Sequence, residues 1–241
     1  MGNDGLQPAY VLHNRRYRES SLIVELLTRD HGRVAALAKG VLGGKRARQS
    51  LLQPFAPLLV AWRGLGDLPT LTAIEAAGPL RLPRGNTLYC GLYVNELLLK
   101  LTQRGDPYSE LFPPYVLCLA ELLQAENQTR HLEPALRRFE VRLLQELGLG
   151  MSLTHDQQGR PLEPALQYRY DFQSGPVVAT AGENTVRGST LLGLNTGEFA
   201  GKQEMLEARR LMRHVLAHHL GGQPLKSREL FRGSGGQGAA G

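Results

Sequence analysis

The sequence has little cysteine and no long apolar run. Its 241 residues contain only Cys90 and Cys118, which are much farther apart than the cysteines of a Cys-x-x-Cys pair. Two cysteines without neighbouring histidines cannot complete a structural zinc site or build a disulfide framework. Both lie in apolar helical patterns, so we expect two small, buried side chains. No apolar stretch approaches the length of a membrane span, and residues 1–8 lack the basic and apolar regions of a signal peptide, which indicates a cytoplasmic protein.

Motifs for nucleotide hydrolysis, acyl transfer and metal-dependent catalysis are also missing. The run Gly43-Gly44-Lys45 is followed by Arg46, where a phosphate-binding loop needs Ser or Thr. No Gly-x-Ser-x-Gly turn occurs. His214 and His218 have a spacing that can hold a metal on one helix face, but no third ligand and no His-Glu-x-x-His motif accompany them. We therefore expect no enzyme, no bound metal and no cofactor.

Acidic residues are absent from one long interval of the N-terminal third. No Asp or Glu lies between Asp30 and Asp67, an interval that contains Arg33, Lys39, Lys45, Arg46, Arg48 and Arg63. Residues 1–80 hold ten Lys or Arg against six Asp or Glu, which accounts for most of the net charge of +6. Uncompensated positive charge favours an anionic partner, most commonly nucleic acid, because each neutralised phosphate releases counterions. The alternative is a solvated loop that only aids solubility.

The first 80 residues have the pattern of a small β-domain. Five β-rich or apolar runs bounded by turn residues predict strands at 9–13, 21–28, 33–38, 55–62 and 69–76. Asp30-His31-Gly32 is a tight hairpin signal, and a longer glycine-rich excursion at 40–54 separates the third and fourth runs. This layout matches a Greek-key barrel of the OB-fold type. We therefore predict an OB-fold nucleic-acid-binding domain over residues 1–80.

From residue 81 onwards the hydrophobic period becomes helical, which predicts a mostly α-helical domain over 81–232 and an α+β fold for the chain. Helices are expected at 87–103 with Thr87 as its cap, at 113–125, from Glu133 to Gly148, and at 203–220. An irregular or β insertion at about 150–185 includes a possible hairpin of 168–172 with 176–179. A short segment at 225–232 is expected to dock on the domain through Leu225, Leu230 and Phe231. The small-residue tail at 233–241 is expected to be disordered.

Several stretches, in order along nearly the whole chain, resemble the RecO family of bacterial recombination mediators. They are Tyr10–His13, Arg15–Ser21, Gly32–Val34, Ala38–Gly40, Leu52–Phe55, Leu88–Leu97, Glu133–Glu140 and Gly221–Phe231. No single stretch is decisive, but the set is specific. The resemblance implies an N-terminal OB-fold followed by an α-helical domain, which agrees with the change of period at residue 81.

The resemblance also implies a function and partners. Members of the family bind single- and double-stranded DNA, anneal complementary strands and contact the acidic C-terminal tail of single-strand-binding protein. With RecR, and in some settings RecF, they help load RecA onto coated strands at the nucleoid, and they are not enzymes. Some members carry a four-cysteine zinc site in the part corresponding to 150–185. This chain has only His155 there, so zinc is expected to be absent.

A basic groove with aromatic side chains is what an OB barrel needs to bind nucleic acid. We expect phosphate contacts from Arg15, Arg16 and Arg18 in the first inter-strand loop, from Arg33, and from Lys39, Lys45, Arg46 and Arg48 in the third connection. Tyr17 and Trp62 are the aromatics best placed to stack on bases, although Trp62 could equally be a core or rim residue. Such binding would be independent of sequence and sensitive to salt.

The third predicted helix offers a second candidate site. Arg137, Arg138 and Arg142 are expected to receive the tail of single-strand-binding protein, because an arginine beside apolar walls suits a hydrophobic peptide with a free carboxylate. Alternatively, Glu133 and Arg137 form an ordinary pair on one helix face. Without the resemblance, the residues also allow an RNA- or ribosome-associated OB protein, or a helical adaptor whose basic loops only solubilise it.

Overall fold

The chain forms two compact units. The computed structural model describes residues 3–42, 46–64, 66–79, 81–125, 131–182 and 184–233. The first unit combines the chain up to Leu119 with the segment from Ser227 onwards, and the second comprises Ala120–Lys226. The helices that precede Leu119 and follow Lys226 therefore belong to the same unit as the β-domain. The compact unit extends beyond the predicted domain of residues 1–80.

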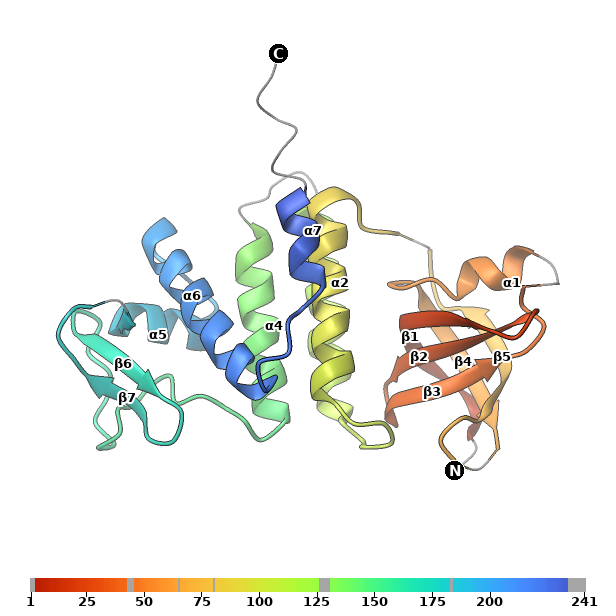
Figure 1. The fold of residues 1–241 in the computed structure, drawn as a ribbon, viewed down its shortest axis with the longest axis horizontal. Helices are drawn as coiled ribbons and strands as arrows, with labels where there is room; N and C mark the ends of the chain where they lie inside the picture. The colour runs from red at the N-terminus through yellow and green to blue at the C-terminus, as the bar shows by residue number, and fades with distance from the viewer. Residues whose placement is uncertain are drawn as a thin grey trace, which may run out of the picture. The chain divides into compact units, whose positions relative to one another are not determined.

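Five strands of the first unit close into a barrel (Figure 1). They are β1 (Asn3–Tyr17), β2 (Ser21–Thr28), β3 (Gly32–Ala38), β4 (Pro57–Arg63) and β5 (Thr70–Ala76). Their order around the barrel is β1-β2-β3-β5-β4, with β4 pairing back onto β1. The only parallel contact among the described strands of the barrel joins β3 to β5 at Leu37 and Thr70. This OB-like barrel confirms the predicted fold class.

Apolar side chains from every strand fill the barrel. Val11, Val24, Ala36 and Val60 have no exposed surface. The central strand β2 is buried at every position, so it lacks the alternation of a strand with one face in water. Its long apolar run predicted these bounds correctly. The other strands agree within a few residues, except β1, which is much longer than 9–13.

Helix α2 (Gly85–Leu101) belongs to the barrel's unit. Its Gly91 faces the ring of Phe55, and a Cβ at Gly91 would lie 2.7 Å from that ring. The helix begins after Arg84, and Thr87 stands at the third helical position, where its hydroxyl accepts the Arg84 N–H at 3.1 Å. The cap of this helix is therefore Arg84, three residues before Thr87, the cap that we predicted.

Two short helices also belong to this unit. The segment predicted as a glycine-rich loop contains α1 (Arg46–Leu51), which was missed because six residues are too short for a helical period. Near the end of the chain, α7 (Ser227–Gly233) packs on α2. The Glu96 carboxylate accepts the Ser227 backbone N–H at 2.8 Å and the Ser227 hydroxyl at 2.6 Å. The last segment therefore docks as expected. Of the side chains expected to hold it, Leu225 is buried, Leu230 is 39% exposed, and that of Phe231 lies outside the described residues.

The second unit is helical with a small sheet. It contains α4 (Leu132–Glu146), α5 (Gly188–Thr196) and α6 (Lys202–His219), with strands β6 (Gln167–Asp171), β7 (Gly175–Val178) and β8 (Thr185–Arg187) in the order β7-β6-β8. A short helical turn, Ser109–Leu111, precedes α3 (Phe112–Gln124), which contributes to both units. The predicted hairpin is confirmed. Strand β8 and helix α5 were missed, since a three-residue strand and a helix rich in Gly, Ser and Thr give little signal.

We expected residues 233–241 to be disordered. The residues after Gly233 lie outside those that the structure describes. Both cysteines are buried, as expected. Across the described ranges, no helix is long and apolar enough to span a lipid bilayer.

Candidate nucleic-acid interface

The strand register brings several predicted DNA contacts to one end of the barrel. Arg16 of β1 lies opposite Leu22 of β2, and Leu22 lies opposite Ala38 of β3. Lys39 follows Ala38 directly and therefore lies at the same end as the turn between β1 and β2. Arg18 occupies that turn.

Most of these cations reach solvent. The side chains of Arg15, Arg16, Arg18 and Lys39 are exposed, whereas Tyr17 is half-buried. Arg15 and Arg16 lie within β1 and not in the loop predicted for them, because β1 continues to Tyr17. The Arg18 guanidinium lies 5.3 Å from the centre of the Tyr17 ring, so a cation and an aromatic face are already paired at the turn.

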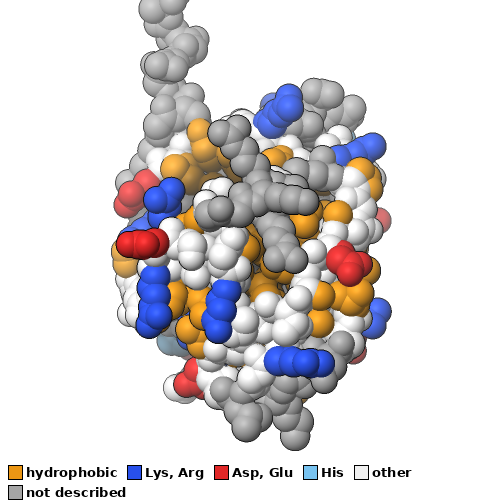
Figure 2. Space-filling view, turned by 90° about the vertical axis from the view of Figure 1, so that its right-hand side faces the viewer, with side chains coloured by type: hydrophobic (Ala, Val, Ile, Leu, Met, Phe, Trp, Pro, Cys, Tyr) orange, Lys and Arg blue, Asp and Glu red, His pale blue; other side chains and the backbone are white. Residues whose placement is uncertain are grey.

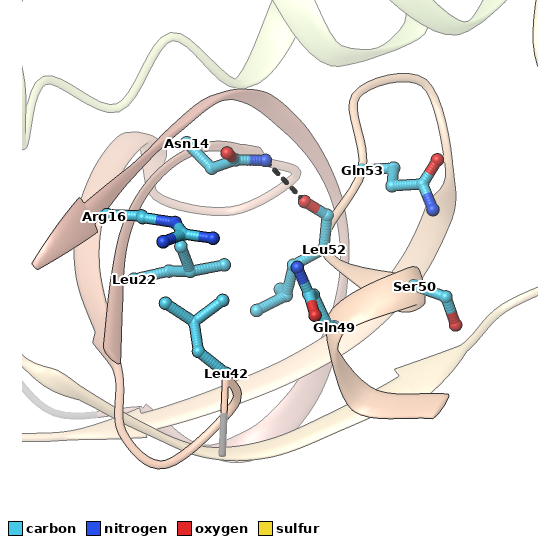
Figure 3. Close-up of a pocket in the computed structure, with 8 residues that line it drawn as sticks. All are labelled: Asn14, Arg16, Leu22, Leu42, Gln49, Ser50, Leu52 and Gln53. Carbon is cyan, nitrogen blue, oxygen red and sulfur yellow. Dashed lines mark hydrogen bonds between the residues drawn. The ribbon is translucent and has the colours of Figure 1, made fainter. Parts of the chain in front are cut away.

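A pocket of about 460 Å³ opens beside Arg16 (Figure 3). Leucine side chains form its apolar wall, and polar side chains form its rim; the lining residues are Asn14, Arg16, Leu22, Leu42, Gln49, Ser50, Leu52 and Gln53. The Asn14 amide donates to the Leu52 carbonyl at 2.8 Å, which ties β1 to the segment after α1. Figure 3 shows Arg16 and Gln49 extending towards the leucines. The amides were missed because nothing in their spacing marks them as binding residues.

The predicted contact Lys45 lies outside the described residues, as do the side chains of Arg46 and Arg48. The two residues that flank these positions, Leu42 and Gln49, both line the pocket. The Leu42 backbone N–H also donates to the Ser20 carbonyl at 2.9 Å. Leu42 and Gln49 therefore both lie at the pocket, and Leu42 also contacts the turn that carries Arg18.

Arg33 has a structural position, contrary to the prediction that it contacts DNA. Its guanidinium donates to the carbonyls of Leu98 and Leu99 in the last turn of α2, where unpaired carbonyls favour a cation. It also lies 3.7 Å from the carboxylate of Glu25, which Arg104 binds from the other side. Burial lowers the pKa of Arg33. The positive charge of the neighbouring Arg104 also lowers this pKa, whereas the negative charge of Glu25 raises it. Only 13% of this side chain is exposed.

Trp62 is a core residue and cannot stack on a base in this conformation. It is 2% exposed and belongs to the hydrophobic cluster inside the barrel. The His31 ring contacts it edge-on, with centroids 5.4 Å apart. Of the two predicted stacking aromatics, only Tyr17 retains an accessible surface. The core alternative for Trp62 is the one that the structure favours.

The charged surface around the barrel is broad. Figure 2 shows Lys and Arg side chains distributed around this face of the molecule, with apolar areas, neutral polar areas and several Asp or Glu side chains between them. Such a surface suits a nucleic-acid backbone, whose phosphates are spread along the strand, better than it suits one compact anion.

The three arginines of α4 do not converge. Arg137 is buried and pairs with the fully buried Glu140 at 2.8 Å. Arg138 is partly exposed and binds the Glu121 carboxylate at 2.9 Å and the Gly197 carbonyl at 3.1 Å. Arg142 is exposed and donates to the Gln145 side chain at 3.2 Å. The alternative pairing of Glu133 with Arg137 is not formed, because Glu133 pairs with Arg209 at 3.0 Å.

The histidines of α6 form an aromatic cluster. His218 stacks on Phe172 with ring centroids 4.0 Å apart, and His214 lies 5.0 Å from the same ring. In the described ranges, no group of three or more His, Cys, Asp or Glu side chains is arranged to hold a metal ion.

Comparison with known proteins gives matches along almost the whole chain. The family model for the recombination protein O N terminal matches residues 4–80, and that for the recombination protein O C terminal matches residues 82–229. A curated protein named DNA repair protein RecO from Methylococcus capsulatus is 45% identical over 95% of this chain and 93% of its own length. Proteins of the same name from Nitrosococcus oceani and Halorhodospira halophila are 47% and 46% identical, each over 94% of this chain and over 92% and 96% of their own lengths.

Proposed function

This chain belongs to the recombination protein O (RecO) family, and on that premise we propose that it is a non-catalytic recombination mediator in DNA repair. It binds single- and double-stranded DNA and anneals complementary strands. With RecR, and in some settings RecF, it helps load RecA onto strands coated with single-strand-binding protein. It acts at the nucleoid in the cytoplasm and needs no cofactor.

The observation that carries the DNA-binding part is the set of exposed cations at one end of the barrel. Arg16, Arg18 and Lys39 are exposed there, beside a pocket with a polar rim. A strand crossing this end would have its phosphates neutralised while its bases remain able to pair. Screening the repulsion between two backbones in this way is the physical basis that we propose for annealing.

Binding is tested by replacing Arg16, Arg18 and Lys39 together with alanine and measuring single-strand affinity across a salt series. If the three cations each neutralise one phosphate, the slope of log affinity against log salt falls by about 2. Arg29→Ala is the matched control, because Arg29 is also exposed but follows the opposite end of β2 and pairs with Asp30. A triple variant with the same affinity and slope as the unmodified protein would overturn the assignment of this surface.

The basic stretch between Leu42 and Gln49 is tested separately. Replacing Lys45, Arg46 and Arg48 together with alanine is expected to lower affinity and salt slope to a similar extent. Unchanged binding would remove these three residues from the interface.

Mediator activity requires a different assay. Two complementary oligonucleotides are coated with single-strand-binding protein, and their annealing is followed with and without this protein over a salt series. Acceleration that fades with salt supports the proposal. DNA binding without any acceleration would indicate a simpler nucleic-acid-binding role, and stronger binding to RNA in direct competition would indicate an RNA-associated one.

The tail of single-strand-binding protein is proposed to dock on the helical unit near α4. Arg142 is the α4 arginine that remains exposed for a peptide carboxylate, while Arg138 is partly exposed and held by Glu121. Arg142→Glu is expected to weaken the binding of a synthetic tail peptide at least tenfold in calorimetry. Arg160→Glu, another exposed arginine of the same unit, is the control for a general charge effect. Equal affinity of the two variants would place the peptide elsewhere.

A further inference from the structure

We infer that the pocket beside Arg16 holds one unpaired nucleobase of a strand bound across the barrel. The inference rests on the proposed DNA binding and adds to it the part of the ligand that the pocket takes. The volume of about 460 Å³ is within the usual range of sites for small organic ligands. One flat ring system with part of its sugar is a ligand of that class.

The chemistry of the lining matches a base better than a phosphate or a metal ion. Leu22, Leu42 and Leu52 give apolar surface for the faces of a ring. Besides amides and the Ser50 hydroxyl, the described lining carries a guanidinium and no carboxylate, which disfavours a metal ion. Amide and guanidinium groups are the side chains that form paired hydrogen bonds with base edges.

The polar groups of the pocket differ in how firmly they are held. The Asn14 amide is fixed by its bond to the Leu52 carbonyl at 2.8 Å. Within the described part of the chain, no carboxylate lies within ion-pair distance of Arg16. Arg16 and Gln49 both extend towards the apolar wall (Figure 3). These two side chains are therefore the ones available to the edge of an entering base.

Exposed cations lie at the same end of the barrel as the pocket. Arg18 lies in the turn after β1, and Lys39 follows β3 at the same end of the barrel. Phosphates held at these positions would place the attached base near the pocket opening. A base inside a duplex is stacked and paired and cannot enter, whereas a base of a single strand can turn out of the backbone. The pocket would therefore favour single-stranded DNA over duplex DNA, whereas phosphate contacts alone would not.

The test compares two oligonucleotides of equal length and charge, one of thymidine and one in which every base is removed. Fluorescence anisotropy with the full-length protein is expected to show about hundredfold tighter binding of the base-bearing strand, of which about tenfold comes from a base held in the pocket and about tenfold from a base stacked on Tyr17. Gln49→Ala and Leu42→Ala are expected to lower that preference to about tenfold, the share that comes from a base stacked on Tyr17. Because neither substitution changes charge, the salt slope should not move. Gln103→Ala, an exposed glutamine that does not line the pocket, is the matched control.

The outcomes separate this inference from the proposed function. If the protein binds both oligonucleotides equally and with a clear salt slope, DNA binding stands and the base pocket is wrong. If Gln49→Ala and Leu42→Ala keep the full preference, bases are held elsewhere and the inference is also overturned. If neither oligonucleotide binds, the proposed function fails and the inference fails with it.

Discussion

The side-chain amide of Asn95 in α2 donates to the Leu12 carbonyl of β1 at 2.9 Å, although 83 positions separate the two residues. The register between β1 and β2 shifts between Val11 and His13, so Leu12 has no partner in β2. Such a bulge disrupts the hydrogen-bond ladder, and Asn95 here gives the Leu12 carbonyl a donor. The Tyr115 hydroxyl donates to the Asn95 side-chain oxygen at 2.8 Å, which fixes the orientation of the amide.

Removing Asn95 should therefore destabilise the barrel's unit. Asn95→Ala takes a partner from a buried carbonyl and a buried hydroxyl, and we expect it to cost about 3 kcal/mol in the free energy of unfolding measured with urea. Tyr115→Phe removes only the hydroxyl and should cost about 1 kcal/mol. Equal stability of Asn95→Ala and the unmodified protein would show that water replaces the amide at no cost.

Gly32 should be the least replaceable of the barrel's turn glycines. Its φ is +58°, and a Cβ there would lie 2.1 Å from the Asp106 carbonyl oxygen. Gly40 has a similar φ of +67°, but a Cβ added to it would meet no atom within 4 Å, so it controls for backbone strain alone. Gly40→Ala should cost about 1 kcal/mol in thermal or urea unfolding, and Gly32→Ala about 2 kcal/mol more because the backbone must move. Similar losses in both variants would contradict the close contact.

The sequence predicted the elements that depend on local pattern. The bounds of β2, β3, β5 and the longer helices follow from apolar periodicity and turn residues, and Asn95 and Glu96 were included in a stretch that resembles the family. Their roles were not predictable, because their partners Leu12 and Ser227 are distant in sequence and become neighbours only through the fold.

The binding residues were harder to predict for the same reason. Charge alone could not distinguish Arg16, which is exposed, from Arg33, which is partly buried and bonded to the end of α2. Aromatic type could not distinguish Tyr17 from Trp62, because strand register decides which side chain faces the barrel interior.

Replacing Arg137 should destabilise the fold, and any loss of peptide binding should be a consequence of that lower stability. Its Nη2 lies 2.8 Å from a carboxylate oxygen of Glu140, and both side chains are buried. Arg137→Ala is expected to cost about 3–5 kcal/mol, since a buried charge loses an ion-pair partner. Arg142→Ala, one turn further along α4 and exposed, should change unfolding by less than about 0.5 kcal/mol. A stable Arg137→Ala variant that has lost peptide binding would restore Arg137 as a direct contact.

Glu207 should make the second unit less stable in acid. Burial acts to raise the pKa of this carboxyl, but hydrogen bonds from Thr190, the Arg187 backbone N–H and Gln203, with the charge of Arg187, hold it below its ordinary value. Because the folded-state pKa is the lower one, the stabilisation is complete above the unfolded value of about 4.3 and is lost as the pH falls through the folded-state value.

The acid sensitivity is measured by urea unfolding over a pH series. Glu207→Gln should flatten the decline in stability below about pH 5, at the cost of lower stability near neutral pH. Thr190→Val should cost about 2 kcal/mol near neutral pH, because its hydroxyl donates to the ionised carboxylate at 2.7 Å. Glu198→Gln, at an exposed carboxylate of the same unit, controls for the loss of one charge. An unchanged pH profile in Glu207→Gln would assign the acid sensitivity to other groups.

Tyr17 and Trp62 should differ in what their replacement changes. Trp62 is buried in the barrel core, so Trp62→Ala is expected to cost about 3–5 kcal/mol in the free energy of unfolding. Trp62→Phe keeps most of the apolar volume and should retain the DNA affinity of the folded protein. Tyr17 is half-buried at the strand end beside Arg18, so Tyr17→Ala should lower single-strand affinity about tenfold with a smaller effect on stability. The assignment would be reversed if Trp62→Phe folded but bound DNA tenfold more weakly while Tyr17→Ala kept its full DNA affinity. In that case the barrel would have to open when DNA binds.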